Sequence, residues 1–268
     1  MIKEISSTQN PTIKHLVALQ EKSRIRRKTG EFLIEGVREI NLAFDAGFEL
    51  TQIFFCPVIA QTEALEELQT KISSTTEQIV VTEEVYKKIA YRSGTEGIIA
   101  SAKAKKNALN DLNLPENPLI LVAEAPEKPG NIGALLRTAD AAGVDAFILA
   151  NPRTDLYNPN IIRSSVGGLF TIPVATGSTE EVINFLKHQN ISIYTAILQE
   201  AISYEKQDFT TSSALVVGTE ADGLSEEWRK AAKQNIIIPM QGRLDSMNVS
   251  VAAAILIFEA RRQRGFTL

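Results

Sequence analysis

The chain has few of the residues that bind metals or form disulfides. It contains one cysteine, Cys56, and two histidines, His15 and His188, among 268 residues. A single cysteine excludes an internal disulfide, and these three residues do not have the spacing of a metal site. Cys56 ends the apolar run 53–56, which favours a buried structural thiol over a nucleophile. We therefore expect no metal in this protein.

Long hydrophobic runs are also missing. No apolar run approaches the roughly 18 residues that a membrane helix needs, and the first residues lack the hydrophobic stretch of a signal peptide. These absences predict a soluble, cytoplasmic protein with no membrane partner. With 44% hydrophobic and 22% charged residues, the chain could build one large α/β domain or two ordinary domains. We expect two.

The net charge of −4 argues against nucleic acid, but the charge is unevenly distributed. Residues 1–108 carry 15 Lys and Arg against 14 Asp and Glu, whereas residues 109–268 carry 13 against 18. Within the first part, residues 22–28 hold five cations, a density suited to a phosphate backbone. The alternative is the solvated end of a helix. The five cations are Lys22, Arg24, Arg26, Arg27 and Lys28.

Helical and strand patterns alternate along the first hundred residues. Asn10 and Pro11 are a typical cap and first turn for a helix that runs towards the basic cluster, and Gly30 ends it. This alternation predicts a small α/β domain over residues 1–105, followed by a proline-bearing linker at 106–117. The expected strands are 31–35, 52–56 and 78–81, and the expected later helices are 37–46, 62–70 and 83–90.

A second α/β domain is predicted over residues 118–268. Its strands are continuous apolar runs, which is typical of a parallel sheet covered by helices on both faces. The last helix, 247–264, has almost no polar face, so we expect a second subunit to cover part of it in a homodimer. The expected strands are 119–123, 146–150, 191–196, 215–217 and 236–238, with helices at 132–142, 179–188 and 225–233.

Three loops of this domain concentrate glycine and polar residues directly after predicted strands, where open α/β sheets bind ligands. The first, residues 127–139, could be an anion or nucleotide site or an ordinary entry into a helix. It lacks the Gly-x-Gly-x-x-Gly pattern, so a nicotinamide-dependent oxidoreductase has weak support. In the second loop, Glu220 could simply be a helix cap. In the third, Ser246 or Asn248 could cap the last helix.

Taken together, the order and spacing of the loops resemble the three motifs of the SpoU (TrmH-like) family of RNA methyltransferases. Lys128 stands where the family often has aspartate, and Met247 replaces a usual leucine of similar size. The N-terminal segments 6–14 and 32–36 resemble the RNA-binding domain that many members carry. The matching motif residues are Asn131, Gly133, Arg137, Thr138 and Ala139, then Gly218, Glu220, Gly223 and Leu224, then Ile238, Pro239, Met240, Gly242, Ser246, Asn248, Val249, Ser250 and Ala252.

The resemblance implies transfer of a methyl group from S-adenosylmethionine to a ribose 2′-hydroxyl in RNA. Ribosomal RNA is favoured over transfer RNA as the substrate, and a non-catalytic RNA-binding or ribosome-assembly protein is the alternative. The implied fold has a deep trefoil knot in the C-terminal domain and a ribosomal-protein-like N-terminal domain. The basic cluster 22–28 then becomes an expected RNA contact.

The resemblance also implies roles for single residues. We expect Arg137 to orient the 2′-hydroxyl and stabilise developing charge, because a guanidinium keeps its proton and is a poor base. The substrate phosphate or a neighbouring group then helps to remove the proton. The other implied catalytic residues are Asn131, Glu220, Ser246 and Asn248. The implied cofactor contacts are Gly218, Glu220, Gly223, Ile238, Met240, Met247 and Asn248, with Arg262 as a further RNA contact.

Overall fold

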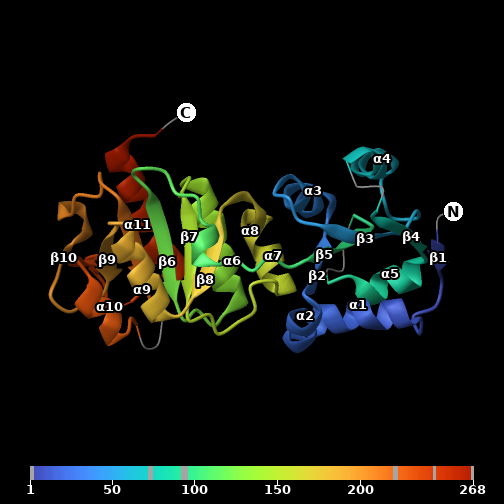
Figure 1. The fold of residues 1–268 in the computed structure, drawn as a ribbon, viewed down its shortest axis with the longest axis horizontal. Helices are drawn as coiled ribbons and strands as arrows, with labels where there is room; N and C mark the ends of the chain where they lie inside the picture. Colours follow the sequence, from blue (N-terminus) through green and yellow to red (C-terminus); the bar gives the residue numbers. More distant parts are fainter. Residues whose placement is uncertain (1–2, 72–74, 92–95, 220–222, 244–245, 267–268) are drawn as a thin grey trace. The chain divides into compact units, whose positions relative to one another are not determined.

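Two compact units make up the computed structural model (Figure 1). The first comprises residues 1–106 and 155–171, and the second comprises residues 107–154 and 172–268. The predicted domain boundary after residue 105 lies close to the observed division after residue 106. The predicted C-terminal domain is continuous, whereas in the structure residues 155–171 return to the first unit. The structure describes residues 3–71, 75–91, 96–219, 223–243 and 246–266.

The first unit contains a five-stranded mixed sheet in the order β1-β4-β3-β5-β2. The strand β5 pairs antiparallel with both β2 and β3, whereas β4 pairs parallel with β1 and β3. Asn10 caps α1 by accepting a hydrogen bond from the Thr12 N–H, and Gly30, with φ +66°, ends α2. The strands are β1 (Lys3–Ile5), β2 (Glu31–Glu35), β3 (Leu50–Phe55), β4 (Glu77–Val81) and β5 (Ile98–Lys103). The helices are α1 (Pro11–Glu21), α2 (Ser23–Thr29), α3 (Val37–Asp45), α4 (Thr62–Lys71), α5 (Glu83–Ile89), α7 (Pro159–Ser165) and α8 (Gly168–Thr171).

Aromatic side chains attach the returning segment 155–171 to this unit. The ring centroids of Phe32 and Tyr157 lie 4.3 Å apart, and those of Phe48 and Phe170 lie 5.2 Å apart. Such pairs add to the hydrophobic burial of large side chains. The segment is therefore part of the hydrophobic core of the first unit.

A partly buried carboxylate on β2 links this strand to its neighbours in the first unit. Glu31 accepts hydrogen bonds from Lys103, at 2.7 Å, and from His15, at 3.0 Å. Burial raises the pKa of Glu31, but the contacts with Lys103 and His15 together outweigh burial and leave it below the ordinary value.

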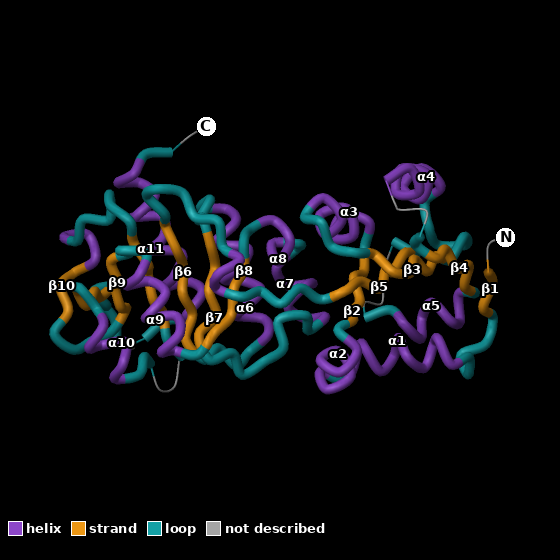
Figure 2. The backbone as a smooth tube through the Cα atoms, viewed as in Figure 1, coloured by secondary structure: helices purple, strands orange, loops and turns teal. Residues whose placement is uncertain are grey.

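The second unit is built on a seven-stranded, wholly parallel sheet in the order β10-β12-β9-β11-β6-β7-β8 (Figure 2). Every residue of its central strands β6, β7 and β11 is buried, as expected for strands covered on both faces. The strands are β6 (Leu119–Glu124), β7 (Ala146–Ala150), β8 (Val174–Gly177), β9 (Ser192–Ala196), β10 (Ala201–Ser203), β11 (Ser213–Val217) and β12 (Gln234–Ile237). The helices are α6 (Pro129–Ala141), α9 (Thr179–His188), α10 (Glu226–Ala231) and α11 (Val249–Arg264).

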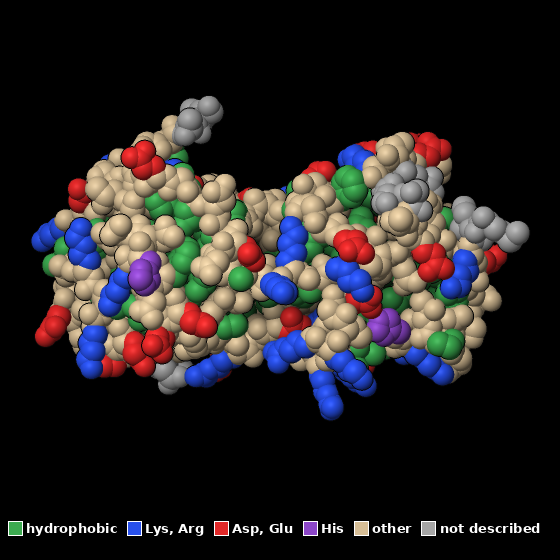
Figure 3. Space-filling view, in the orientation of Figure 1, with side chains coloured by type: hydrophobic (Ala, Val, Ile, Leu, Met, Phe, Trp, Pro, Cys, Tyr) green, Lys and Arg blue, Asp and Glu red, His purple; other side chains and the backbone are tan. Residues whose placement is uncertain are grey.

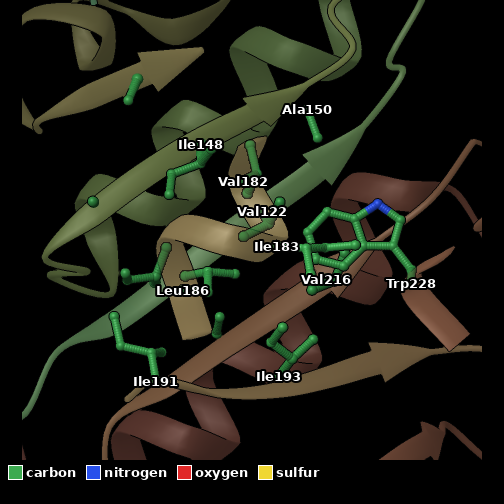
Figure 4. Packing of buried hydrophobic residues seen from close by; sticks show 14 of the residues in the cluster. Val122, Ile148, Ala150, Val182, Ile183, Leu186, Ile191, Ile193, Val216 and Trp228 are labelled. Atoms are coloured by element: carbon green, nitrogen blue, oxygen red, sulfur yellow. The ribbon is translucent and has the colours of Figure 1, made fainter. Parts of the chain in front are cut away.

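One hydrophobic cluster of this unit joins the sheet to α9 and α10. Figure 4 shows Val182 and Leu186 of α9 and Trp228 of α10 lying against Val122 and Val216 of the sheet. The expected linker belongs to the same cluster, since the leucines at 109, 112 and 114 pack against it. Residues 107–117 are therefore part of the second unit.

The final helix α11 is buried along only one face of this single chain. Ala253, Leu256 and Ile257 are buried, whereas Val251 is 50% exposed and Phe258 is 39% exposed. At its end, the Arg264 guanidinium donates to backbone carbonyls next to the starts of β6 and β11, including that of Asn117 at 2.8 Å.

No helix within the described residues is long and apolar enough to span a membrane.

Candidate active site

A cavity of about 430 Å³ opens at the carboxyl ends of β12, β9 and β11, which are neighbours in the sheet. This is the edge at which parallel α/β sheets bind ligands. Its volume lies within the ordinary range of small-molecule sites. The described lining residues belong to the second unit and lie in the segments 196–199, 217–219, 223–224, 236–240 and 246–252, together with Arg229.

The second glycine loop forms one wall of this cavity with its backbone. A Cβ on Gly218 would lie 2.2 Å from the carbonyl oxygen of Gly223, so only glycine fits there. Gly223 has φ +68°, which also favours glycine. Thr219 and Gly223 exchange two backbone hydrogen bonds, each 3.1 Å long. Glu220, predicted for both the catalytic and the cofactor site, lies outside the described residues.

The first and third loops meet through two asparagines. The Asn248 side-chain nitrogen donates to Oδ1 of Asn131 at 3.2 Å, while Oδ1 of Asn248 accepts from the Ser250 N–H at 3.0 Å. Asn248 thus caps α11 and contacts the first turn of α6 at the same time. The two roles considered for Asn248, as helix cap and as site residue, are compatible.

The structure brings most of the predicted cofactor residues together. Arg137 lies on the exposed surface of α6, and within the described part of the chain no hydrogen bond or ion pair engages its guanidinium. In the described part of the cavity wall, Arg229 is the only charged side chain. The predicted residues that line the cavity are Gly218, Gly223, Ile238, Met240, Ser246 and Met247.

Glu124, at the carboxyl end of β6, is a further residue of this region that the sequence patterns did not single out. It is 5% exposed and accepts hydrogen bonds from the Thr179 hydroxyl, the Ser225 hydroxyl and the Ser225 N–H, at 2.7 to 2.8 Å. Ser225 directly follows the second loop, so the carboxylate anchors one end of that loop. The sequence did carry a signal for Glu124, because an acidic residue at the end of a buried apolar strand needs hydrogen-bond partners.

The basic cluster of the first unit divides into exposed and buried members. Arg24, Arg27 and Lys28 are exposed on α2, and Lys22 is exposed immediately before it. Figure 3 shows Lys and Arg side chains gathered over α2.

The expectation that Arg26 contacts RNA is corrected. Its side chain is 4% exposed, and its Nε donates to Asp155 at 2.5 Å, with further bonds to the carbonyls of Leu19 and Gln20. A buried guanidinium with these partners is unavailable to phosphate. Arg26 instead holds the returning segment against the end of α1.

Arg262, the other predicted RNA contact, forms an ion pair at the surface of α11. Its guanidinium donates twice to Glu259, at 2.8 Å, and these bonds lower the pKa of Glu259 and raise that of Arg262. The Arg262 side chain is 65% exposed, whereas that of Glu259 is only 12% exposed. Among the described residues, no group of three His, Cys, Asp or Glu side chains could hold a metal ion.

The family comparison agrees with the loop geometry. A model of the SpoU rRNA methylase family matches residues 118–258, which include all three loops and α6. The chain belongs to this family. A model of the MRM3-like substrate-binding domain matches residues 10–100, which lie in the first unit, whereas the SpoU match covers most of the second unit together with the segment 155–171.

Several SpoU relatives align with almost the whole chain. A 23S rRNA (guanosine(2553)-2′-O)-methyltransferase RlmP from Bacillus subtilis is 30% identical, over 97% of this chain and 100% of its own length. A crystal structure described as an RNA 2′-O ribose methyltransferase is 39% identical, with a TM-score of 0.83 over 97% of this chain and 99% of that one. AviRb from Streptomyces viridochromogenes, solved with AdoMet, is 28% identical, with a TM-score of 0.88 over 96% and 98%.

Proposed function

We propose that this protein transfers the methyl group of S-adenosylmethionine to a ribose 2′-hydroxyl of ribosomal RNA. The observation that carries the proposal is the meeting of the three loops, since the second and third line one cavity and Asn248 joins the third to Asn131 of the first. The names of the relatives support the substrate and the position of the methyl group.

The cavity fits S-adenosylmethionine in size and chemistry. Apolar side chains such as Ile236, Ile238 and Met240 suit an adenine ring, and the backbone of residues 217–219 and 223–224 supplies polar groups at the cavity wall. Arg229 offers a cation for the carboxylate of the methionine part. The bound cofactor supplies an activated methyl group on a sulfonium ion.

The residues of the chain must hold the ribose oxygen in line with that methyl group. Arg137 orients the 2′-hydroxyl and stabilises the negative charge that develops on its oxygen, because guanidinium stays protonated and presents planar donors. Asn131, Asn248 and Ser246 keep the neighbouring loops in position. The proton passes to a substrate phosphate or a neighbouring group.

The proposal extends to the chain as a whole. The exposed cations Lys22, Arg24, Arg27 and Lys28 contact RNA in a ribosomal-protein-like first unit, and Arg262 adds a contact in the second. The C-terminal segment forms a trefoil knot, supported by the insertion of β12 between β9 and β10 and by the contacts of Arg264 at the starts of β6 and β11. The enzyme acts on ribosomal RNA in the cytoplasm.

A homodimer is part of the same proposal. The apolar side chains of Val251 and Phe258 on α11 are exposed in the single chain, and a second copy would cover them. Light scattering should give twice the mass of the chain, and a monomeric mass at micromolar concentration contradicts this part.

The test of the function is methyl transfer itself. Purified protein is incubated with S-adenosylmethionine carrying a labelled methyl group and with ribosomal or transfer RNA from cells that lack the protein. We expect label in ribosomal RNA on a ribose 2′-oxygen, located by mapping nucleotides that resist alkaline cleavage. Label in transfer RNA alone overturns the substrate, and binding of ribosomal RNA without transfer of label overturns the enzymatic activity.

A further inference from the structure

Tyr91 presents an aromatic ring at the surface of the first unit. It is 46% exposed and follows α5, and its backbone N–H donates to the Glu35 carboxylate at 2.6 Å. This bond fixes the backbone of Tyr91 to the end of β2. The residue therefore displays its ring from an anchored position.

Arg163 lies over this ring although it is distant in the sequence. It belongs to α7 in the returning segment, and its guanidinium carbon is 5.7 Å from the ring centroid of Tyr91. A second contact orients it, since it donates to Oδ1 of Asn160 at 2.9 Å. Arg163 is itself exposed. Two planar groups, one of them cationic, are thus held together at the surface.

The cavity beside these two groups is too small for a nucleobase. It has a volume of about 20 Å³, which is room for about one water molecule. Its floor is apolar, formed by residues such as Leu33 and Ile99, and Gln20 and Glu35 add polar atoms to its wall. A planar ligand would therefore lie on Tyr91 and Arg163 at the mouth, with Gln20 beside its edge.

The neighbouring charge favours RNA as the source of that ligand. Gln20, in the cavity wall, precedes Lys22 by two residues, so the exposed cations Lys22, Arg24, Arg27 and Lys28 follow the cavity wall closely in the sequence. Lys and Arg side chains attract the phosphate backbone, whereas aromatic and guanidinium planes stack on unpaired bases. A single RNA strand can therefore place its phosphates on the cations and an unpaired base on the Tyr91 and Arg163 planes.

We propose that Tyr91 and Arg163 form a stacking site for an unpaired RNA base, while the α2 cations hold the adjoining phosphates. The site is assembled from the substrate-binding region and from a segment that follows β7 of the second unit in the sequence. The inference deepens the proposed function, on which it rests for the choice of RNA as ligand.

Binding of two RNA probes measures the contribution of stacking. One probe is a hairpin with an unpaired loop, and the other is a duplex with the same stem and no unpaired base. Fluorescence anisotropy at fixed salt gives both dissociation constants. Tyr91→Leu should weaken hairpin binding about tenfold and leave duplex binding unchanged, because only the hairpin offers a base to stack. Tyr91→Phe, which keeps the ring, should bind both probes like the wild type.

Two further variants separate stacking from charge. Arg163→Lys keeps the cation but loses the plane, so it should weaken hairpin binding more than duplex binding. Lys28→Gln, on α2, should weaken both probes by the same factor and reduce the salt dependence of each. Far-ultraviolet circular dichroism and thermal unfolding of each variant verify that its fold is retained.

The proposal is overturned if Tyr91→Leu and Arg163→Lys, both folded, bind the hairpin as the wild type does, or lose hairpin and duplex equally. That result leaves methyl transfer to ribosomal RNA untouched. If instead the wild type transfers no methyl group but the hairpin-selective loss is observed, the proposed function fails and the stacking site stands.

Discussion

The Gly218→Ala substitution probes the wall of the proposed cofactor cavity with one added carbon atom. The new Cβ would lie 2.2 Å from the carbonyl oxygen of Gly223, 2.3 Å from its carbonyl carbon and 2.7 Å from the Leu224 nitrogen. All three are backbone atoms, so no side-chain rotation can relieve the contact. The strand end and the turn must move apart.

The cost of that movement follows from the bonds that hold the turn closed. Thr219 and Gly223 exchange two backbone hydrogen bonds of 3.1 Å. At about 1 kcal/mol each, their loss amounts to about 2 kcal/mol, which corresponds to about thirtyfold weaker binding of a ligand that needs the closed turn.

Isothermal titration with S-adenosylhomocysteine, the expected product of the cofactor, measures this loss directly. Gly130→Ala is the matched control, because a Cβ at that position on α6 would meet no atom within 4 Å beyond the neighbouring backbone of its own helix. We expect Gly130→Ala to bind like the wild type. An unchanged dissociation constant for a folded Gly218→Ala protein, or an equal loss in Gly130→Ala, would refute the assignment of this turn to the cofactor site.

Three further predictions concern residues with distinct roles. Arg137→Lys should lower the single-turnover rate of methyl transfer at least tenfold while S-adenosylhomocysteine binding is retained, and near-normal transfer with an unchanged pH profile would exclude positioning by the guanidinium. Arg26→Gln leaves Asp155, which is only 9% exposed, without its cation and should lower the free energy of unfolding in urea by about 3 to 5 kcal/mol, so a loss below about 1 kcal/mol contradicts a structural role. Glu31 has a lowered pKa in the folded state, so its ionised form stabilises the protein above the unfolded pKa, and this contribution is lost as the pH falls through the folded value. Glu31→Gln should therefore destabilise the protein at pH 7, with a difference that shrinks below about pH 4.5 and disappears in stronger acid; a difference independent of pH would rule out this ion pair as its cause.

The sequence predicted the second unit better than the first because its strands are continuous apolar runs. The five expected strands there correspond to β6, β7, β9, β11 and β12, while the shorter β8 and β10 were missed. In the first unit the prediction omitted the short edge strand β1 and also β5, an inner strand of the sheet. Its residues 98–103 include two alanines and a serine, which give neither alternation nor a strongly apolar signal.

The three loops show where sequence and structure each contribute. The glycine positions were predictable because a side chain at Gly218 would collide with the backbone and because Gly223 has a positive φ that other residues adopt only with strain. The contact between Asn131 and Asn248 was not, since 117 positions separate them and only packing of α6 against α11 brings them together.

By itself, the sequence determined local features: most of the strongly apolar strands, where several helices begin, which turns require glycine, and the family to which the motifs belong. Tertiary structure alone decided which of these features share a surface. Arg26 belongs to the basic string 22–28, yet the return of residues 155–171 buries it against Asp155. The same return places Arg163 over Tyr91. Periodicity records the environment of a residue along its own helix or strand, whereas a charge is buried or exposed by segments that lie far away in the chain.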